Sequence, residues 1–136
     1  MKLLFVCTDN TCRSPMAQAI FDRLSEQRHL DVTCDSAGLA ACENECANPR
    51  CVDVMNEIGL DISGHRSKNI TLKLLLESDY IVVMTDEQKE RLCAFDPSLC
   101  GKIRVLDVDD PNGRPIEIYR MCRNQIKDHI SRIAEI

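Results

Sequence analysis

The chain has 136 residues, enough for one compact domain with its own buried core. Hydrophobic residues make up 44% and charged residues 29%, which is ordinary for a soluble globular protein. The net charge of −5 argues against general affinity for nucleic acid or for an anionic membrane, because both need clustered Lys and Arg.

The first ten residues, MKLLFVCTDN, reach polar positions too soon for the apolar core of a signal peptide or a membrane span. We therefore expect a cytoplasmic protein. Nine cysteines are many for this length, but the odd count and the missing secretory signal favour reduced thiols over a disulfide framework. The chain has no C-x-x-C pair, and we expect no metal and no cofactor.

Strand and helix patterns alternate from the start of the chain. Residues 2–7 form a short apolar run of the kind buried in a parallel sheet. From Pro15 to about Arg28 the apolar residues recur at helical spacing, which predicts the first helix. Residues 30–36 then alternate in polarity up to Gly38, which predicts a second strand.

The middle of the chain continues the alternation. A second helix is predicted for residues 48–57, ended by Gly59, and a shorter one for residues 71–77. The sequence DYIVVMT, residues 79–85, is the clearest buried strand.

The last third supplies one more strand between two helices. Asp86 resembles the N-cap of a helix that runs to about residue 95, and residues 103–106 form a short apolar strand. After the loop DVDDPNGRP, isoleucines at helical spacing predict a long helix over residues 116–133. Four strands, each followed by helix, indicate a single-domain, three-layer α/β sandwich with helices on both faces of a parallel sheet. Ligands are expected outside the carboxyl ends of the strands.

That geometry places residues 7–14 at the expected ligand edge, between the first strand and the first helix. Cys7 and Arg13 have the spacing C-x5-R, so the loop N–H groups could surround a tetrahedral anion while the guanidinium of Arg13 holds two of its oxygens. The same amides and the hydroxyl of Ser14 would stabilise a Cys7 thiolate beneath the anion. Alternatively, Cys7 is only a buried strand end and Arg13 a solvated helix start.

A thiolate that attacks phosphorus needs a second group to protonate the leaving atom. The loop VDDPNG follows the last predicted strand and supplies Asp109 and Asp110. Pro111 restricts Asp110 to extended geometry, which gives its carboxylate a defined direction. Without the cysteine loop, D-P-N-G would be read as an ordinary turn.

Together these residues resemble the low-molecular-weight protein tyrosine phosphatases. The resemblance covers nearly the whole chain: VCTDNTCRSPMA at the start, SAG at residues 36–38, GLDISGHRS at 59–67, DYIVVMT and DDP. It implies one domain over residues 1–136 with the flavodoxin-like strand order 2-1-3-4. It also implies a phosphorylated protein or peptide as substrate, and a monomer or weak dimer without nucleic-acid or membrane partners.

The resemblance also implies roles for individual residues. Cys7 would form a phosphocysteine, Arg13 would clamp phosphate, and Asp110 would act first as general acid and then as general base. Asn10, Ser14, Ser36 and His65 would shape and support the loop by hydrogen bonding. The substrate-binding loop itself would comprise Thr8, Asp9, Asn10, Thr11, Cys12 and Ser14.

Three departures from the family pattern bear on the substrate. Asp9 stands where a small residue is usual, and Asn112 stands where tyrosine-directed members carry an aromatic wall after Asp-Pro. Thr11 stands where the tyrosine phosphatases tend to carry a larger aliphatic residue. A Thr at this position resembles the bacterial protein arginine phosphatases of the same family. A flat phosphoguanidinium would favour nearby acids, which Asp9 and Asp110, or Glu43 and Glu45 of the next loop, could supply. Phosphotyrosine and phosphoarginine both stay open.

The other cysteines leave further alternatives. In the family, a neighbour such as Cys12 can form a reversible disulfide that protects Cys7 from irreversible oxidation. Cys93 and Cys100 are spaced like the cysteine pair of thioredoxin-linked arsenate reductases, which share this fold and the C-x5-R loop. A third alternative is a phosphate-binding module without catalysis.

Overall fold

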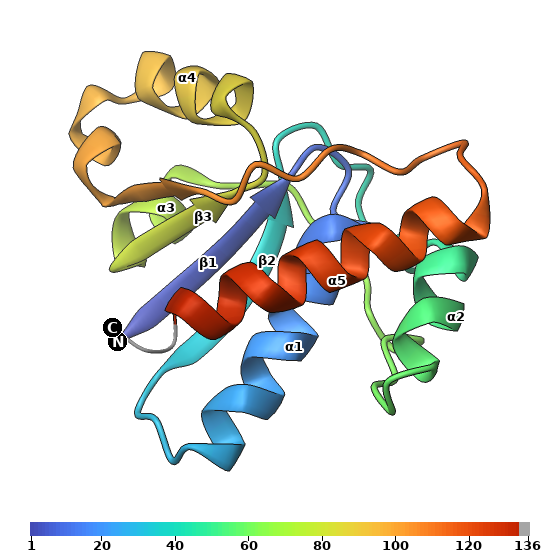
Figure 1. The fold of residues 1–136 in the computed structure, drawn as a ribbon. Coiled ribbons are helices and arrows are strands. Elements are labelled where there is room, and N and C mark those ends of the chain that lie inside the picture. The colour runs from blue at the N-terminus through green and yellow to red at the C-terminus, as the bar shows by residue number, and fades with distance from the viewer. Residues whose placement is uncertain (134–136) are drawn as a thin grey trace.

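A four-stranded, all-parallel sheet lies at the centre of the computed structural model, which describes residues 1–133 (Figure 1). Its order is β2-β1-β3-β4, which confirms the predicted topology. In the register of β1 with the edge strand β2, Cys7 at the end of β1 lies opposite Gly38 at the end of β2. The strands are β1 (Lys2–Cys7), β2 (Thr33–Gly38), β3 (Tyr80–Val83) and β4 (Ile103–Val105).

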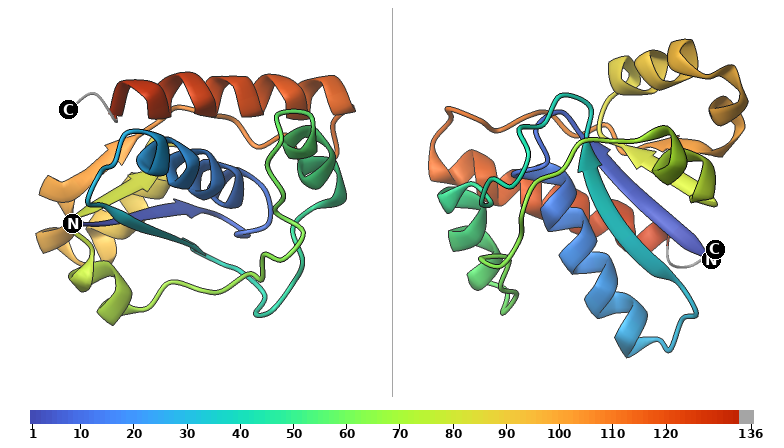
Figure 2. Two further views of the ribbon diagram at one scale, coloured as in Figure 1. Left: turned by 90° about the horizontal axis from the view of Figure 1, so that it is seen from below. Right: turned by 180° about the vertical axis from the view of Figure 1, so that it is seen from behind.

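Helices cover both faces of this sheet, as expected for parallel strands joined by right-handed crossovers (Figure 2). One face carries α1 (Arg13–Gln27) and α5 (Ile116–Ile133), and α2 (Pro49–Asn56) packs beside α5. The other face carries α3 (Leu72–Glu77), α4 (Asp86–Phe95) and the 3-10 helix η1 (Pro97–Lys102). None of these helices combines the length and the apolar character that a bilayer span requires.

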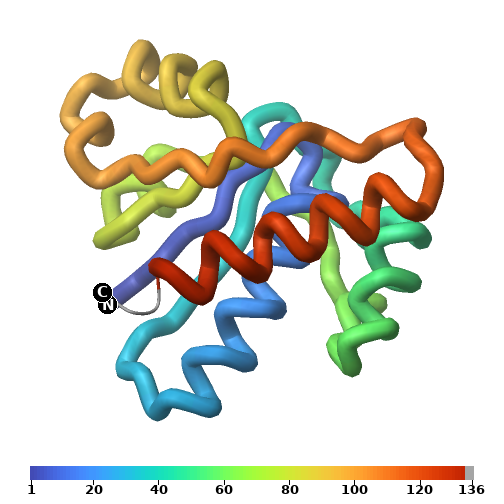
Figure 3. Tube along the Cα trace, viewed as in Figure 1, coloured from blue at the N-terminus to red at the C-terminus, as the bar shows by residue number. Residues whose placement is uncertain are grey.

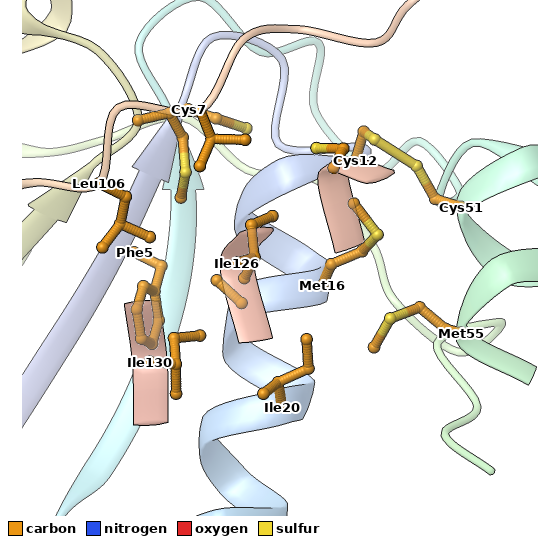
Figure 4. Close-up of a cluster of buried hydrophobic side chains, with 14 of the residues drawn as sticks. Phe5, Cys7, Cys12, Met16, Ile20, Cys51, Met55, Leu106, Ile126 and Ile130 are labelled. Carbon is orange, nitrogen blue, oxygen red and sulfur yellow. A yellow bond between two sulfur atoms is a disulfide. The ribbon is translucent and has the colours of Figure 1, made fainter. Parts of the chain in front are cut away.

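Alternation along β1 divides its side chains between the two layers of the core. Phe5 belongs to the buried cluster on the side of α1 and α5, which also contains Met16 and Ile126 (Figure 4). Leu4 points to the opposite face and packs in the layer that contains Leu92. Both faces of the strand are therefore buried, which explains why its sequence is a continuous apolar run.

Some boundaries differ from those predicted. Strand β2 begins at Thr33 and runs to Gly38, so residues 30–32 lie outside it. The N-cap of α4 is Thr85, which forms a capping box with Gln88, whereas Asp86 is the first helical residue. The helix η1 was not predicted, although its start carries the local signal of Pro97 after an Asp cap.

Helix α2 is fastened to α5 by a charged cluster. Glu57 accepts hydrogen bonds from Arg120 at 2.9 and 2.7 Å and from Arg123 at 2.6 Å. Arg123 also donates to the carbonyl oxygen of Val54 at 2.8 Å. These contacts lower the pKa of Glu57 to about 2, with the Arg120 hydrogen bonds as the largest cause. The end of α2 is thereby positioned relative to the rest of the fold.

Four of the nine cysteines are paired in disulfides. Cys12 is bonded to Cys51, and Cys93 is bonded to Cys100. The prediction that the thiols are reduced is therefore wrong for these four residues. An odd number of cysteines is a property of the whole chain, whereas each disulfide depends on which two side chains the fold brings together. The cysteines without a disulfide are Cys7, Cys34, Cys42, Cys46 and Cys122.

Candidate active site

The turn between β1 and α1 lies at the carboxyl edge of the sheet, where an anion site is expected. It begins at Cys7, which is buried, and ends at Arg13, the first residue of α1. Within the described residues, the backbone N–H groups of positions 9 to 12 donate to no protein acceptor. This is the property that a backbone anion cradle needs, because the amides stay available for oxygen atoms of a ligand.

Asn10 is the centre of the hydrogen-bond network that shapes this turn. Its backbone has a φ of 56°, a left-handed conformation that Asn tolerates better than most residues. Its side-chain amide donates to Ser14 at 2.8 Å and to Ser36 at 3.0 Å, and its Oδ1 accepts from the backbone N–H of Lys68 at 3.0 Å. Every polar atom of this fully buried side chain is therefore used to fix the backbone.

Ser14 connects that network to the sulfur of Cys7. The Sγ atom of Cys7 lies 2.9 Å from Oγ of Ser14. Because Asn10 already donates to the same oxygen, the hydroxyl proton of Ser14 is free to point at the sulfur. A sulfur that accepts this hydrogen bond is stabilised in its thiolate form.

Arg13 and Asp110 meet at the mouth of the turn, although they come from opposite ends of the chain. The guanidinium of Arg13 donates through Nη1 to the carbonyl oxygen of Val108 at 2.9 Å. Its Nη2 lies 3.9 Å from Oδ2 of Asp110, whose side chain is partly exposed. Asp110 belongs to the segment between β4 and α5, and this segment crosses the carboxyl edge of the sheet (Figure 3).

Neighbouring segments support the turn from the β2 and α4 sides. Thr8 accepts a hydrogen bond from Nε2 of Gln88 at 3.2 Å, and its carbonyl oxygen accepts from Ala40 at 2.9 Å. Gly38 lies so close that a Cβ atom on it would be 2.7 Å from the carbonyl oxygen of Thr8 and 2.8 Å from Cβ of Ala41. Only glycine fits at this point without displacing the turn.

His65 holds the turn from the loop that follows α2. Its Nε2 lies 2.6 Å from the carbonyl oxygen of Asn10. A carbonyl oxygen only accepts, so this nitrogen carries the proton. Partial burial lowers the pKa of His65, and the hydrogen bond to Asn10 opposes that shift. The neutral imidazole is therefore the form that this position favours.

A narrow cavity of about 20 Å³ opens above the turn. Its walls come from the turn itself, the start of α2 and the segment before α5. The residues that line it are Cys7, Asp9, Thr11, Cys12, Arg13, Asn48, Asp110 and Asn112.

The structure divides the sequence-predicted binding residues into two groups. Asp9, Thr11 and Cys12 line the cavity, as does the sulfur-bearing Cys7. The side chains of Thr8, Asn10 and Ser14 instead point into the supporting network, together with Ser36 and His65. The resemblance implied a loop-shaping role for Asn10 and Ser14 as well as a place in the substrate-binding loop, and their side chains do not line the cavity.

Two acids proposed from the sequence lie elsewhere. Glu43 accepts a hydrogen bond from the backbone N–H of Asn69 at 2.9 Å, and neither it nor Glu45 lines the cavity. Conversely, the sequence pattern predicts Asn48 only as the start of a helix. As N-cap of α2 it accepts from Arg50, its N–H donates to the carbonyl of Thr11 at 2.8 Å, and it forms part of the cavity wall. Its cap signal is local, but its place beside Thr11 is a product of the fold.

A thiol at the base of an amide-lined turn, an arginine at its end and a carboxylate at its mouth form a coherent chemical set. The thiolate is a nucleophile, the amides and the guanidinium bind tetrahedral oxyanions, and the carboxylate exchanges protons with a leaving group. Such a set is suited to transfer of a phosphoryl group to sulfur and then to water.

Comparison with known proteins agrees with this chemistry. Residues 2–135 match the family described as low molecular weight phosphotyrosine protein phosphatase. The protein-arginine-phosphatase of Bacillus subtilis (strain 168) is 33% identical over 144 residues, covering 99% of this chain and 95% of the relative. Arsenate reductase 2 of Staphylococcus epidermidis is also similar, at 30% identity over 94% of this chain and 92% of the relative.

Solved structures show the same fold. A low molecular weight protein tyrosine phosphatase from T. tengcongensis superposes with a TM-score of 0.95 at 36% identity, covering 99% of this chain and 98% of the other. A mutant of the arginine phosphatase YwlE with a phosphorylated active-site serine gives a TM-score of 0.95 at 32% identity, covering 99% and 94%. With the family match over nearly the full length, these findings show that the chain belongs to the low molecular weight phosphotyrosine protein phosphatase family.

Proposed function

We propose that this phosphohydrolase removes the phosphoryl group from phosphoarginine side chains of proteins, through a phosphocysteine intermediate. The single observation that carries the substrate assignment is the lining of the cavity. Two carboxylates, Asp9 and Asp110, and two amides, Asn48 and Asn112, surround the thiol and Arg13, and no aromatic side chain contributes to the described wall.

In the first step, the thiolate of Cys7 attacks phosphorus in line with the leaving nitrogen. The S–P bond forms as the P–N bond breaks, and Asp110 donates a proton to the departing guanidine. The free amides of the turn and the guanidinium of Arg13 stabilise the equatorial oxygens, whose negative charge is held throughout the transfer. No metal is needed, because these fixed donors supply the charge stabilisation.

In the second step, Asp110 takes a proton from a water molecule that attacks the phosphocysteine. The S–P bond breaks, Cys7 leaves as a thiolate, and inorganic phosphate is released. Ser14 stabilises the leaving sulfur through the 2.9 Å contact described above. The solved YwlE mutant with a phosphorylated active-site serine supports a covalent step of this kind in a relative.

The cavity suits a phosphoguanidinium better than a phosphophenyl ring for an electrostatic reason. A guanidinium group is cationic, flat and rich in N–H donors, so carboxylates and amide oxygens are suitable partners for it. A phenyl ring would instead gain from an aromatic wall, and Asn112 occupies the position after Asp-Pro where such a wall is usual. The similarity to the Bacillus subtilis protein-arginine-phosphatase supports the same assignment.

Phosphotyrosine is the second candidate. The family description names phosphotyrosine, and the relative from T. tengcongensis is a protein tyrosine phosphatase. The methyl group of Thr11 in the wall would contact either substrate. A cytoplasmic location and a monomeric or weakly dimeric state are part of the same proposal and are compatible with either substrate.

The deciding experiment compares kcat/KM on matched phosphoarginine and phosphotyrosine peptides for the wild type, Thr11→Ile and Cys7→Ser. We expect the wild type to favour phosphoarginine, Thr11→Ile to shift the ratio toward phosphotyrosine, and Cys7→Ser to be inactive on both. Thr33→Ile is the matched control, because Thr33 is exposed at the start of β2. A wild type that prefers phosphotyrosine would overturn the arginine assignment and leave the phosphatase chemistry standing.

The same proteins also test two alternative functions, an arsenate reductase and a phosphate-binding module. Arsenate-dependent consumption of reduced thioredoxin would identify an arsenate reductase. Equal hydrolysis of para-nitrophenyl phosphate by the wild type and Cys7→Ser would indicate a binding module without thiol catalysis.

A further inference from the structure

The disulfide between Cys12 and Cys51 joins the active-site turn to helix α2. The two Cα atoms are 5.7 Å apart, within the usual range for a disulfide. Figure 4 shows the bond running from the start of α1 to α2, beside the core. The sequence resemblance implied that Cys12 can form a reversible disulfide that shields Cys7, whereas in the structure Cys12 is bonded to Cys51.

The turn keeps its shape while this bond is formed. Cys7 has no disulfide partner and stays 2.9 Å from the hydroxyl of Ser14. Arg13 still donates to Val108, and the hydrogen bonds of Asn10 are all in place. A chain oxidised at Cys12 and Cys51 therefore retains a free nucleophile and a formed anion cradle. A bond between Cys7 and Cys12 would instead consume the nucleophile.

Access to the two bonded sulfurs is unequal. Cys12 lines the cavity, which it shares with Cys7, whereas Cys51 is 0% exposed. A small oxidant can therefore reach the cavity that Cys12 lines, and Cys12, at 8% exposed, is the one of the two bonded residues that an external thiol can approach. Any exchange at Cys51 must pass through the sulfur of Cys12, which makes Cys12 the link between the nucleophile and the buried thiol.

Another buried thiol near the turn does not compete for this role. Cys122 is shielded by its surroundings, and burial raises its pKa to about 12, so it stays protonated at neutral pH. Its sulfur faces the carbonyl oxygen of Asp109 at 3.9 Å. Cys51 is equally buried, but it is bonded to Cys12 whereas Cys122 has no disulfide, so the position of each thiol, and not its burial, separates the two.

We propose that Cys51 is the resolving thiol of a three-cysteine relay that returns peroxide-oxidised Cys7 to its active form. The inference rests on the proposed function in one respect, namely that Cys7 is the nucleophile of the phosphatase. Under oxidation the relay preserves phosphatase activity, because it replaces a disulfide between Cys7 and Cys12 with one between Cys12 and Cys51. The second disulfide leaves the nucleophile free and the active-site turn formed.

The chemistry balances in three steps. The Cys7 thiolate attacks hydrogen peroxide, so an S–O bond forms, the O–O bond breaks and hydroxide leaves. The Cys12 thiolate then attacks the sulfur of Cys7, and the S–O bond breaks with release of a second hydroxide. The Cys51 thiolate attacks the sulfur of Cys12, and Cys7 departs as a thiolate. The two protons lost by the thiols of Cys12 and Cys51 convert one equivalent of peroxide to water.

An external dithiol of the thioredoxin class completes the cycle. One of its thiolates attacks Cys12, the bonded cysteine that retains some exposed surface, Cys51 leaves as a thiolate, and the second thiol of the reductant resolves the mixed disulfide. Both electrons come from the dithiol, which becomes oxidised.

The test exposes reduced wild type, Cys51→Ala and Cys93→Ala to one equivalent of hydrogen peroxide per chain without added reductant. Cys93→Ala is the matched control, because it removes the other disulfide at α4 and η1. Residual hydrolysis of para-nitrophenyl phosphate is measured relative to the rate of each protein under dithiothreitol. Linked peptides are mapped by mass spectrometry after alkylation of free thiols.

We expect the wild type and Cys93→Ala to keep most of their rate and to yield the linked Cys12–Cys51 peptide. The residual rate of Cys51→Ala should be roughly tenfold lower than that of the wild type. This variant should yield a linked Cys7–Cys12 peptide and recover its full rate with dithiothreitol. Equal loss in the wild type and Cys51→Ala, with a Cys7–Cys12 peptide in both, would overturn the relay.

Cys51→Ser serves as a second substitution, and the rate under dithiothreitol reports whether each variant is folded. If the reduced wild type hydrolyses nothing, the proposed function fails, but the peptide map still decides the relay. A map with no Cys12–Cys51 peptide at any time after peroxide addition also overturns it.

Discussion

The hydroxyl of Ser14 lies 2.9 Å from the sulfur of Cys7 at the base of the anion-binding turn. Asn10 donates to the same hydroxyl oxygen at 2.8 Å and so orients its proton toward the sulfur. The contact is made in both chemical steps, because sulfur is the attacking atom in the first and the leaving atom in the second.

Replacing Ser14 with alanine removes this hydrogen bond to a charged atom, a contact worth about 1.5–3 kcal/mol. We expect kcat for para-nitrophenyl phosphate to fall roughly ten- to hundredfold, since each 1.4 kcal/mol corresponds to a factor of ten. Ser25→Ala is the control, because Ser25 is also buried but bonds to the carbonyl oxygen of Leu30, away from the turn. Equal effects of the two substitutions would contradict the assigned role.

Asp110→Asn tests the proton donor. The asparagine keeps the shape of the side chain but lacks a transferable proton, so the first step should slow by roughly 10²–10⁴-fold on poor leaving groups. Good leaving groups need little protonation and should be affected least. Steady-state rates on a series of aryl phosphates measure this dependence. If Asp109→Asn has the larger effect, the acid is Asp109, which does not line the cavity.

Gly38→Ala tests how closely β2 supports the turn. Its Cβ would lie 2.7 Å from the carbonyl oxygen of Thr8, a backbone atom that cannot move alone. We expect a loss of roughly 1–3 kcal/mol in the free energy of unfolding, the usual cost of overpacking, together with slower hydrolysis. Urea denaturation measures the first and kcat the second. Gly64→Ala is the control, because an added Cβ there has no neighbour within 4 Å beyond the adjoining residues of the chain. The free energy of unfolding of this variant should change little.

His65 should give the folded state a component of stability that depends on pH. Burial lowers its pKa below 6.5, so the neutral form is favoured in the folded chain. Protonation then costs more in the folded state than in the unfolded state. This component is fully present above pH 6.5 and is lost as the pH falls through the lowered pKa.

Urea denaturation of the wild type and His65→Gln between pH 8 and pH 5 tests this sign. The free energy of unfolding of the wild type should fall more steeply below pH 6.5 than that of His65→Gln. His129→Gln, on α5 and away from the turn, should follow the wild type. A variant curve parallel to that of the wild type would show that His65 does not carry the effect.

The elements of the fold were predictable because their signals are local. A continuous apolar run such as β1 is buried on both faces, and apolar residues at helical spacing mark α1 and α5. The boundaries moved by a few residues where capping decided them, as at Thr85. The short helix η1 was missed because an Asp-Pro start also fits an ordinary turn.

The candidate site was predictable to the extent that one short segment builds it. Cys7 and Arg13 are six positions apart, so chain geometry alone places them at the two ends of one turn. The roles assigned to the turn residues stay predictions for the experiments above. The resemblance implied that Asn10 shapes the loop, and the structure places its side chain in the supporting network while the neighbouring Asp9 lines the cavity.

The sequence by itself determined the order of strands and helices, the anion-binding turn after β1 and the chemical groups available to it. Only the tertiary structure decided that Asn48 forms part of the cavity wall, that Asp110 reaches Arg13, and that Cys12 pairs with Cys51 rather than with Cys7. The physical reason is separation along the chain. Spacing within a turn is fixed by covalent geometry, whereas contacts between distant segments depend on how helices pack on the sheet, which no local pattern encodes.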